Sequence, residues 1–355
     1  MQQEPAPRCL VAAGGTAGHV LPALAVAESL RRRGAHVTLA GRPDSVEERL
    51  ARSAGLEFDP FRVEGLPRAV SMRLARALVR DAAAPAACVR ILRRRRPDVV
   101  LGAGGYVGGP MVLAAGVTRI PAALTEADAH LGLGNRLAAP FAKRVFLAFP
   151  IEGLEGPRYR VVGRPIPERS RPPAREQARE TFALPPEGPV VLVFGGSQGA
   201  RRLNEAALAA FAAAGPAVLH LAGERDFAEL EKRPRRDDYR LLAFTDEFGA
   251  ALAAADLVVA RAGGSVWEIA AAGKPALLVP YPHATADHQS KNARYFERGG
   301  GAVVVPEAAL DLGRQVSNLL ADPDQLARMS AAMRALARPD AADVVAEELL
   351  ALARA

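Results

Sequence analysis

Glycine-rich turns follow apolar runs in both halves of the chain. The run Leu10–Ala13 leads into Gly14-Gly-Thr-Ala-Gly-His19, and the run Val190–Phe194 leads into Gly195-Gly-Ser-Gln-Gly199. Glycines let backbone N–H groups approach an anion, and the N-terminus of a following helix adds partial positive charge. Two such turns in separate halves suggest one ligand held between two domains.

The second of these turns is the stronger phosphate candidate. Ser197 and Gln198 can donate hydrogen bonds in addition to the backbone amides. No lysine follows in the GxxxxGK(S/T) pattern, so the turn is not the phosphate loop of a nucleoside triphosphatase. The alternative is a plain tight turn between a strand and a helix.

The first turn has the spacing GGxxGH, which differs from the GxGxxG fingerprint of dinucleotide-binding proteins. His19 falls in the first turn of the expected helix, where the positive end of the helix dipole favours a neutral imidazole. A neutral imidazole can act as a general base. Phosphate binding or helix capping by His19 fits the sequence equally well.

A carboxylate follows a third apolar run. Leu257–Ala260 leads into Arg261-Ala-Gly-Gly-Ser-Val-Trp-Glu268, which places Glu268 a few residues into a helix. A carboxylate there can accept hydrogen bonds from both hydroxyls of a ribose, although a favourable charge near a helix N-terminus is a simpler explanation. Residues that could hold sugar hydroxyls, or be plain loop residues, are His283, Asp287, His288 and Gln289.

Metal binding is the weaker hypothesis. No set of carboxylates and histidines has the spacing of metal ligands. Asp322-Pro-Asp324 matches a DxD metal signature, but an Asp followed by Pro predicts a helix cap with proline at the first helical position. We therefore expect neither a metal site nor a cofactor.

Composition bounds the class of protein. A chain of 355 residues exceeds what one hydrophobic core usually serves, and half of its residues are hydrophobic. The net charge is +7, yet aromatics make up only 5% and no nucleic-acid-binding module is visible, so we expect no nucleic-acid partner. Clustered arginines fit an anionic membrane surface or a phosphorylated substrate. The clusters contain Arg31 to Arg33, Arg68, Arg73, Arg76, Arg80, Arg90 and Arg93 to Arg96.

The compartment is predicted to be reducing. Cys9 and Cys88 lie in apolar segments without CxxC spacing, as expected of small core residues. The polar amino terminus predicts no signal peptide, and no apolar run reaches the roughly 18 residues that a membrane span requires. We expect a cytoplasmic protein that does not cross the membrane.

Strand-like and helix-like segments alternate along the chain, which predicts an α/β fold with doubly wound parallel sheets. Residues 164–189 are rich in Pro, Arg and Glu, a composition that packs poorly and suits a connection between domains. The expected strands are Leu10–Ala13, His36–Gly41, Asp98–Gly102, Ile120–Leu124, Arg144–Ala148, Val190–Phe194, Ala217–Leu221, Tyr239–Ala243, Leu257–Ala260, Ala276–Val279 and Ala302–Val305.

Taken together, the motifs resemble the MurG family of glycosyltransferases. The resemblance rests on residues 14–19, 102–110, 195–200 and 261–293, in that order along nearly the whole chain. It implies inverting transfer of N-acetylglucosamine from UDP-N-acetylglucosamine to lipid I, an undecaprenyl-linked acceptor, forming lipid II at the cytoplasmic face of the cell membrane. It also implies a GT-B fold of two Rossmann-like domains with a cleft between them and no DxD-bound metal.

The resemblance also implies domains and site residues. Residues 1–163 would form the acceptor-side domain, with a C-terminal helix at about 340–355 packed on it, and residues 164–339 the UDP-sugar domain. The implied catalytic residues are His19, Glu126 and Asp128. The implied diphosphate, ribose, uracil and donor-sugar contacts are Ser197, Gln198, Gly199, Gly264, Ser265, Glu268, Phe244, Thr245, His288 and Gln289. The implied contacts on the acceptor side are Thr16, Gly18, Asp128 and Arg164.

Departures from the family pattern fall mainly on the acceptor side. Thr125-Glu-Ala-Asp128 stands where the family usually has His-Glu-Gln-Asn, and Arg164-Pro-Ile-Pro167 stands in place of Asn-Pro-Val-Arg. Glu126 and Asp128 would repel an acceptor diphosphate unless a basic group such as Arg136 or Lys143 offsets them. Alternatively, one carboxylate helps His19 to take the acceptor proton. Donor chemistry is thus better defined than acceptor identity.

Three other functions remain open at this point. They are a related GT-B transferase acting on another lipid or natural product, a GT-B-fold UDP-N-acetylglucosamine epimerase, and a binding protein that catalyses no reaction.

The segment Leu66–Leu92 has apolar side chains beside arginines, which predicts docking on an anionic inner leaflet. An ordinary amphipathic helix with a solvated basic face is the alternative.

Overall fold

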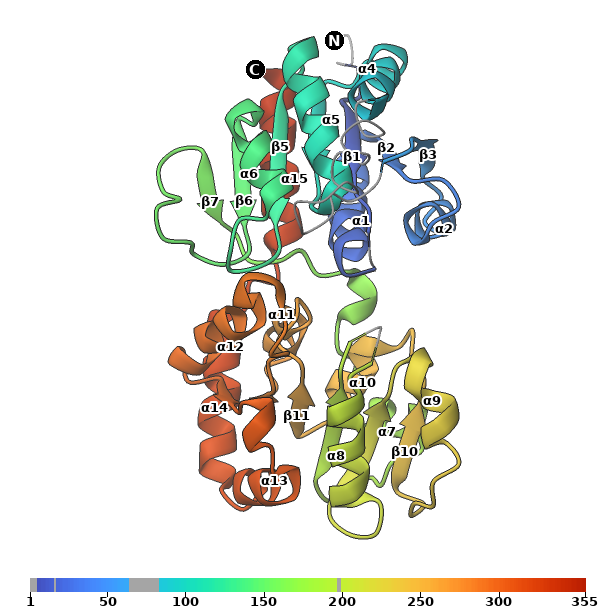
Figure 1. Cartoon of the computed structure of the whole chain (residues 1–355), viewed down its shortest axis with the longest axis vertical. Coiled ribbons are helices and arrows are strands. Elements are labelled where there is room, and N and C mark those ends of the chain that lie inside the picture. The colour runs from blue at the N-terminus through green and yellow to red at the C-terminus, as the bar shows by residue number, and fades with distance from the viewer. Residues whose placement is uncertain (1–4, 16, 64–82, 197–198) are drawn as a thin grey trace, which may run out of the picture. The chain divides into compact units, whose positions relative to one another are not determined.

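The computed structural model describes residues 5–15, 17–63, 83–196 and 199–355. Thr16, Ser197, Gln198 and the stretch 66–82 of the expected membrane-docking segment therefore lie outside the described residues. The chain divides into two compact units, the first formed by residues up to 167 together with 339–355, and the second by residues 168–338 (Figure 1).

The first unit is built on a seven-stranded parallel sheet in the order β3-β2-β1-β4-β5-β6-β7. Its interior strands are almost wholly buried, as expected for a parallel sheet covered on both faces. The strands are β1 (Arg8–Ala12), β2 (His36–Gly41), β3 (Glu57–Pro60), β4 (Val99–Gly102), β5 (Ala122–Glu126), β6 (Arg144–Leu147) and β7 (Tyr159–Val161).

Helices cover both faces of this sheet. Cys9 and Val11 point toward α1, α2 and α15, whereas Leu10 and Ala12 point toward α4, α5 and α6, because successive strand residues face opposite sides. The helix α15 packs against α1, so the C-terminal end of the chain belongs to the first unit (Figure 1). These helices are α1 (Ala17–Arg32), α2 (Val46–Ser53), α4 (Ala83–Arg95), α5 (Gly105–Thr118), α6 (Leu133–Ala138) and α15 (Ala341–Arg354), with a 3-10 turn η1 (Ala139–Phe141).

The second unit repeats this plan with a six-stranded parallel sheet in the order β10-β9-β8-β11-β12-β13. Its strands are β8 (Val190–Phe194), β9 (Ala217–Leu221), β10 (Tyr239–Leu242), β11 (Leu257–Ala260), β12 (Ala276–Leu278) and β13 (Ala302–Val304). Its helices are α7 (Arg175–Thr181), α8 (Arg201–Phe211), α9 (Glu224–Leu230), α10 (Phe248–Ala254), α11 (Val266–Ala271), α12 (His288–Arg298), α13 (Leu312–Leu320) and α14 (Pro323–Leu336). Its 3-10 turns are η2 (Glu168–Ser170), η3 (Thr285–Asp287) and η4 (Glu307–Ala309).

The predicted doubly wound parallel architecture is confirmed, and each expected strand is present within two residues of its predicted limits. The edge strands β3 and β7 were not predicted. The expectation that residues 164–189 pack poorly is wrong for α7, which packs against α10. Arg179 is 2% exposed there and donates hydrogen bonds to the carbonyls of Pro185, Gly188 and Ala254.

Candidate active site

Each sheet has one point where its strand order reverses direction. In the first unit it lies between β1 and β4, and in the second between β8 and β11. Parallel sheets of this type bind ligands beyond the carboxyl ends of the strands at such a point. The four strands are followed by Ala13, Ala103, Gly195 and Arg261, and Gly14 comes directly after Ala13. The glycine-rich segments found in the sequence therefore lie at the two expected binding edges.

In the first unit, His19 is the third residue of α1, which confirms its predicted position in the first helical turn. Its imidazole lies against Gly104, since a Cβ at Gly104 would be 3.0 Å from His19 Cδ2. Gly104 also has φ +78°, a conformation that favours glycine. The loop after β4 therefore packs against the Cδ2 edge of the histidine ring.

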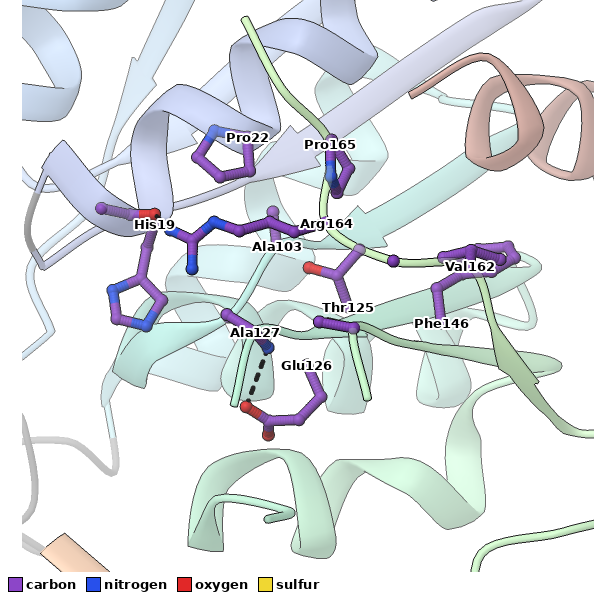
Figure 2. A pocket seen from close by; sticks show the side chains of 14 residues that line it. His19, Pro22, Ala103, Thr125, Glu126, Ala127, Phe146, Val162, Arg164 and Pro165 are labelled. Atoms are coloured by element: carbon purple, nitrogen blue, oxygen red, sulfur yellow. Dashed lines mark hydrogen bonds between the residues drawn. The ribbon is translucent and has the colours of Figure 1, made fainter. Parts of the chain in front are cut away.

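A small pocket at this edge brings several predicted residues together (Figure 2). His19, Gly18, Arg164 and Glu126 all line it. Arg164 is 9% exposed, and its Nη2 donates a hydrogen bond to the carbonyl oxygen of Gly18. Arg164 thus fixes the first turn of α1, although it lies 146 residues further along the chain than Gly18.

The carboxylate of Glu126 is turned toward the backbone of its own loop (Figure 2). Oε1 accepts hydrogen bonds from the amides of Ala127 at 3.0 Å and Asp128 at 3.3 Å. Oε2 accepts from the amide of Gly132 and from Asn135 Nδ2, both at 2.9 Å. Glu126 therefore holds the loop between β5 and α6 in one conformation.

Burial raises the pKa of the Glu126 carboxyl above its usual value, while the hydrogen bonds from Gly132 and Asn135 act in the opposite direction. The nearby charge of Asp128 raises it further. Asp128 is half-buried, and it does not belong to the described residues that line the pocket. Of the two predicted acids, only Glu126 shares this pocket with His19.

In the second unit, the glycine-rich turn after β8 is closely packed. A Cβ at Gly199 would lie 2.4 Å from the carbonyl oxygen of Ala222, and Gly199 has φ +70°. A Cβ at Gly195 would lie 2.3 Å from the Cβ of Ala200. Glycine is thus required at both positions, which brings the backbone close to any group bound at the N-terminus of α8.

A buried polar network supports this turn, and the sequence did not predict it. His220 Nε2 donates to Asn204 Oδ1 at 3.0 Å, and His220 Nδ1 accepts from the Tyr239 hydroxyl at 2.8 Å. Asn204 Nδ2 donates to the carbonyl of Ala222 at 2.9 Å and to Asp226 Oδ2 at 3.0 Å. Because the Asn204 amide donates twice, its Oδ1 accepts, so His220 carries its proton on Nε2.

The predicted ribose residue lies at the second unit's binding edge. Glu268 is the third residue of α11, and its Oε1 accepts a hydrogen bond from Ser170 Oγ at 2.6 Å. Gly264 and Ser265 precede this helix, with Ser265 at the N-cap. All three residues follow β11, one of the two strands at the reversal point.

The remaining predicted donor contacts lie on loops at the same edge. Phe244 follows β10 and is 54% exposed, and Thr245 Oγ1 accepts a hydrogen bond from the amide of Glu247 at 3.0 Å. His288 Nδ1 donates to the carbonyl of Thr285 at 2.8 Å, which leaves Nε2 as the acceptor in a neutral ring. Gln289 Oε1 accepts from the amide of Tyr281 at 2.9 Å, which orients its side chain.

Two other candidates make contacts within the same loop. The ring of His283 packs edge-on against Tyr281 with centroids 5.6 Å apart, and Asp287 Oδ1 accepts from Ser290 Oγ at 2.6 Å.

The DxD-like segment forms a helix cap. Asp322 Oδ1 accepts from the amide of Gln325 at 2.8 Å, which confirms the predicted helix cap of α14. Within the described ranges, no three His, Cys, Asp or Glu side chains form a group that could hold a metal ion.

Comparison with known proteins identifies the family. The glycosyltransferase family 28 N-terminal domain matches residues 9–147 and its C-terminal domain matches residues 190–345. A relative from Halorhodospira halophila is 42% identical, with 95% of this chain and 96% of that protein covered. The crystal structure of Acinetobacter baumannii MurG is 28% identical with a TM-score of 0.76, covering 97% of this chain and 99% of the other. This chain belongs to the MurG family.

The MurG family assignment confirms the predicted GT-B fold and a glycosyltransferase activity. A relative from Halothermothrix orenii, 36% identical over 92% of this chain and 94% of that protein, carries the same name as the one from Halorhodospira. That name is UDP-N-acetylglucosamine–N-acetylmuramyl-(pentapeptide) pyrophosphoryl-undecaprenol N-acetylglucosamine transferase. The calicheamicin glycosyltransferase CalG4, at 20% identity and a TM-score of 0.71, has the same fold.

Proposed function

We propose that this protein transfers N-acetylglucosamine from UDP-N-acetylglucosamine to lipid I, forming lipid II for peptidoglycan. The observation that carries the proposal is the near full-length identity of 36% and 42% to relatives named for this transfer. The two phosphate-suited turns and the carboxylate at Glu268 supply the chemistry that such a donor needs. In a bacterium, cell shape and division would depend on this step.

The proposed reaction is a single displacement with inversion. The acceptor hydroxyl oxygen attacks the anomeric carbon of N-acetylglucosamine from the face opposite UDP, and the bond from that carbon to the diphosphate oxygen breaks. UDP leaves with the electron pair, and a base takes the hydroxyl proton. Backbone amides and the N-terminus of α8 would stabilise the negative charge that develops on the diphosphate.

His19 is our candidate for the base. It lies in the first turn of α1, and the Gly104 loop packs against its ring. Arg164 supports the same turn through the carbonyl of Gly18. Glu126 is assigned as a positioning residue, because three amides of its own loop and the Asn135 side chain from α6 occupy its two oxygens. Asp128 is the other candidate acid for proton transfer, although it is not among the described residues that line the pocket with His19.

On the donor side, Glu268 would accept the ribose hydroxyls, with Ser170 fixing the orientation of its carboxylate. Phe244 and Thr245 would contact the uracil, since Phe244 offers an exposed aromatic face. His288 and Gln289 would contact the donor sugar, and Gly199 together with Ser197 and Gln198 would contact the diphosphate. Gly264 and Ser265 would border the nucleotide at the start of α11.

We further propose that the protein docks peripherally on the anionic cytoplasmic face of the membrane. Among the described residues, no helix is long and apolar enough to span a bilayer. A surface groove between α4 and α5 combines apolar and basic side chains, and its Val117 is 75% exposed. The groove is formed by Pro85, Ala86, Val89, Arg90, Arg93, Leu113, Ala114 and Val117. This mixture suits an amphipathic membrane contact.

The experiment that tests the function compares acceptors with one donor. The full chain is incubated with UDP-N-acetylglucosamine and a lipid I analogue, a different polyprenyl-linked sugar, or no acceptor. Turnover with the lipid I analogue alone supports the proposal. A preference for another acceptor would indicate a related transferase, and epimerisation or hydrolysis without acceptor would indicate the epimerase reaction.

A further inference from the structure

Arg42 lies immediately after β2, at the same sheet edge as the turn that precedes His19. Its guanidinium carbon is 5.4 Å from the centroid of the Tyr106 ring, and its Nε is 3.5 Å from Glu47 Oε1. The side chain is 40% exposed, although Nε itself is buried. Within the described residues, no acceptor makes a hydrogen bond to this guanidinium.

The partner that holds Arg42 is a fully buried carboxylate. Glu47 is 0% exposed, and its Oε2 has no hydrogen-bond partner among the described residues. The backbone amide of Arg42 donates to Glu47 Oε1 at 3.4 Å. A buried carboxylate is costly without a compensating charge, so Glu47 draws the arginine toward the sheet edge. The aromatic face of Tyr106 adds a second, cation–π restraint.

This assembly is packed against the glycine turn of the candidate site. A Cβ at Gly14 would lie 2.7 Å from Glu47 Oε1, and a Cβ at Gly15 would lie 3.5 Å from Tyr106 Cε1. Tyr106 is the second residue of α5, which begins directly after the Gly104 loop that supports His19. Arg42 is therefore fixed on the β2 side of the turn, whereas the pocket with His19 lies toward β4 and β5.

We propose that Arg42 binds an anionic group of the acceptor, a phosphate or a carboxylate, and so contributes to acceptor selection. A planar guanidinium held on two sides, without a hydrogen bond to any other described residue, is suited to bidentate contact with such a group. The inference rests on the proposed function, because an N-acetylmuramyl-pentapeptide pyrophosphoryl lipid carries both a diphosphate and peptide carboxylates.

Kinetics of Arg42→Gln in the full chain test the inference. We expect the KM for the lipid I analogue to rise about tenfold or more, with the KM for UDP-N-acetylglucosamine and kcat changed less than about twofold. Arg42→Lys should recover part of the loss, since it restores the charge without the planar fork. Arg52→Gln is the matched control, because Arg52 is an exposed arginine paired with Glu48 on α2.

Two acceptor arms distinguish the source of the anion. A penalty for Arg42→Gln that persists with a diphosphate acceptor lacking the peptide assigns Arg42 to phosphate. A penalty that disappears with an acceptor whose peptide carboxylates are amidated assigns it to the peptide. If wild-type protein uses lipid I and Arg42→Gln leaves its acceptor KM unchanged, the inference is wrong and the proposed function stands.

Thermal unfolding of the same variants separates binding from structural support. Equal rises in donor and acceptor KM together with a lower Tm would mean that Arg42 only neutralises Glu47, which overturns the inference. A wild-type chain that fails to glycosylate lipid I overturns the proposed function and, with it, this assignment.

Discussion

Ser170 Oγ donates a hydrogen bond to Glu268 Oε1 at 2.6 Å, joining residues 98 positions apart within the second unit. Ser170 is buried and ends the 3-10 turn η2 at the start of that unit, whereas Glu268 lies in the first turn of α11. The contact fixes the rotamer of the half-buried carboxylate at the binding edge. A carboxylate oriented before the ligand arrives binds hydroxyl groups at a smaller entropic cost.

The first prediction concerns donor binding by Glu268. Glu268→Ala should raise the KM for UDP-N-acetylglucosamine by roughly 10- to 100-fold, since charge-assisted hydrogen bonds contribute about 1.5 to 3 kcal/mol. Ser170→Ala should cause a smaller rise, because it loosens the carboxylate without removing it. Isothermal titration with UDP provides the measurement, and unchanged affinity in Glu268→Ala would refute the ribose assignment.

The second prediction separates catalysis from binding at His19. His19→Ala should lower kcat by about 10²-fold or more while UDP affinity stays nearly unchanged, as expected for loss of a general base. Single-turnover kinetics and UDP titration measure the two quantities. A variant that retains kcat and loses only ligand affinity would assign His19 to phosphate binding. His36→Ala, on the exposed start of β2, is the control.

The third prediction concerns the two acids after β5. Glu126→Gln should impair acceptor kinetics, because a Gln amide nitrogen would meet N–H donors on the Gly132 or the Ala127 side. Asp128→Asn should leave this loop intact. A large fall in kcat for Asp128→Asn would implicate Asp128 in proton transfer, whereas unchanged or improved turnover of lipid I would exclude it. If neither substitution alters acceptor kinetics, the loop does not line the acceptor site.

The fourth prediction follows from the buried His220. Burial lowers the pKa of His220 from its usual value of 6.5 to about 3. Between about pH 3 and pH 6.5, His220 therefore binds a proton in the unfolded chain but not in the folded chain. The free energy of unfolding thus falls as the pH drops below about 6.5. His220 should account for a loss of about 2 kcal/mol in unfolding free energy between pH 7 and pH 5.

Urea unfolding at pH 7 and pH 5 measures this effect. The pH dependence should be weaker in His220→Gln than in the wild type and unchanged in His36→Gln, whose ring is about half exposed. Equal pH dependence in the wild type and His220→Gln would contradict the assignment.

The fifth prediction concerns membrane docking by the groove between α4 and α5. Binding to anionic vesicles should weaken with added salt and in the double variant Arg90→Gln/Arg93→Gln. The double variant Arg314→Gln/Arg328→Gln removes the same charge from exposed positions in the second unit and should bind normally. Binding of the wild type to neutral vesicles as tight as its binding to anionic vesicles would rule out the electrostatic contribution.

The interior strands and the glycine turns were predictable because their signals are local. An apolar run followed by glycines identifies a buried parallel strand and its turn without knowledge of distant residues. The strand β3 escaped prediction because it is polar. Its Asp59 is held by Arg94 and Arg95 at 2.6 Å each, and these arginines come from α4, so the strand is stabilised by contacts that the local pattern does not contain.

The candidate site was predictable in residue type and less so in role. His19 and Glu268 lie at the sheet edges where the sequence placed them. The anchor Ser170, the network through His220 and the arginine held by Glu47 depend on residues far apart in sequence, so no local pattern could reveal them. Glu126 illustrates the limit, because the sequence identifies an acid but not the loop amides and the α6 side chain that donate to it.

The most direct test of the central claim follows the donor sugar itself. The full chain is incubated with UDP-N-acetylglucosamine labelled in the sugar, with and without a lipid I analogue, and the products are separated and identified. The account predicts that label moves to the lipid with an inverted, β-configured anomeric carbon, and that UDP is released only when the acceptor is present. Release or epimerisation of the sugar without acceptor, or no transfer to lipid I, would contradict it.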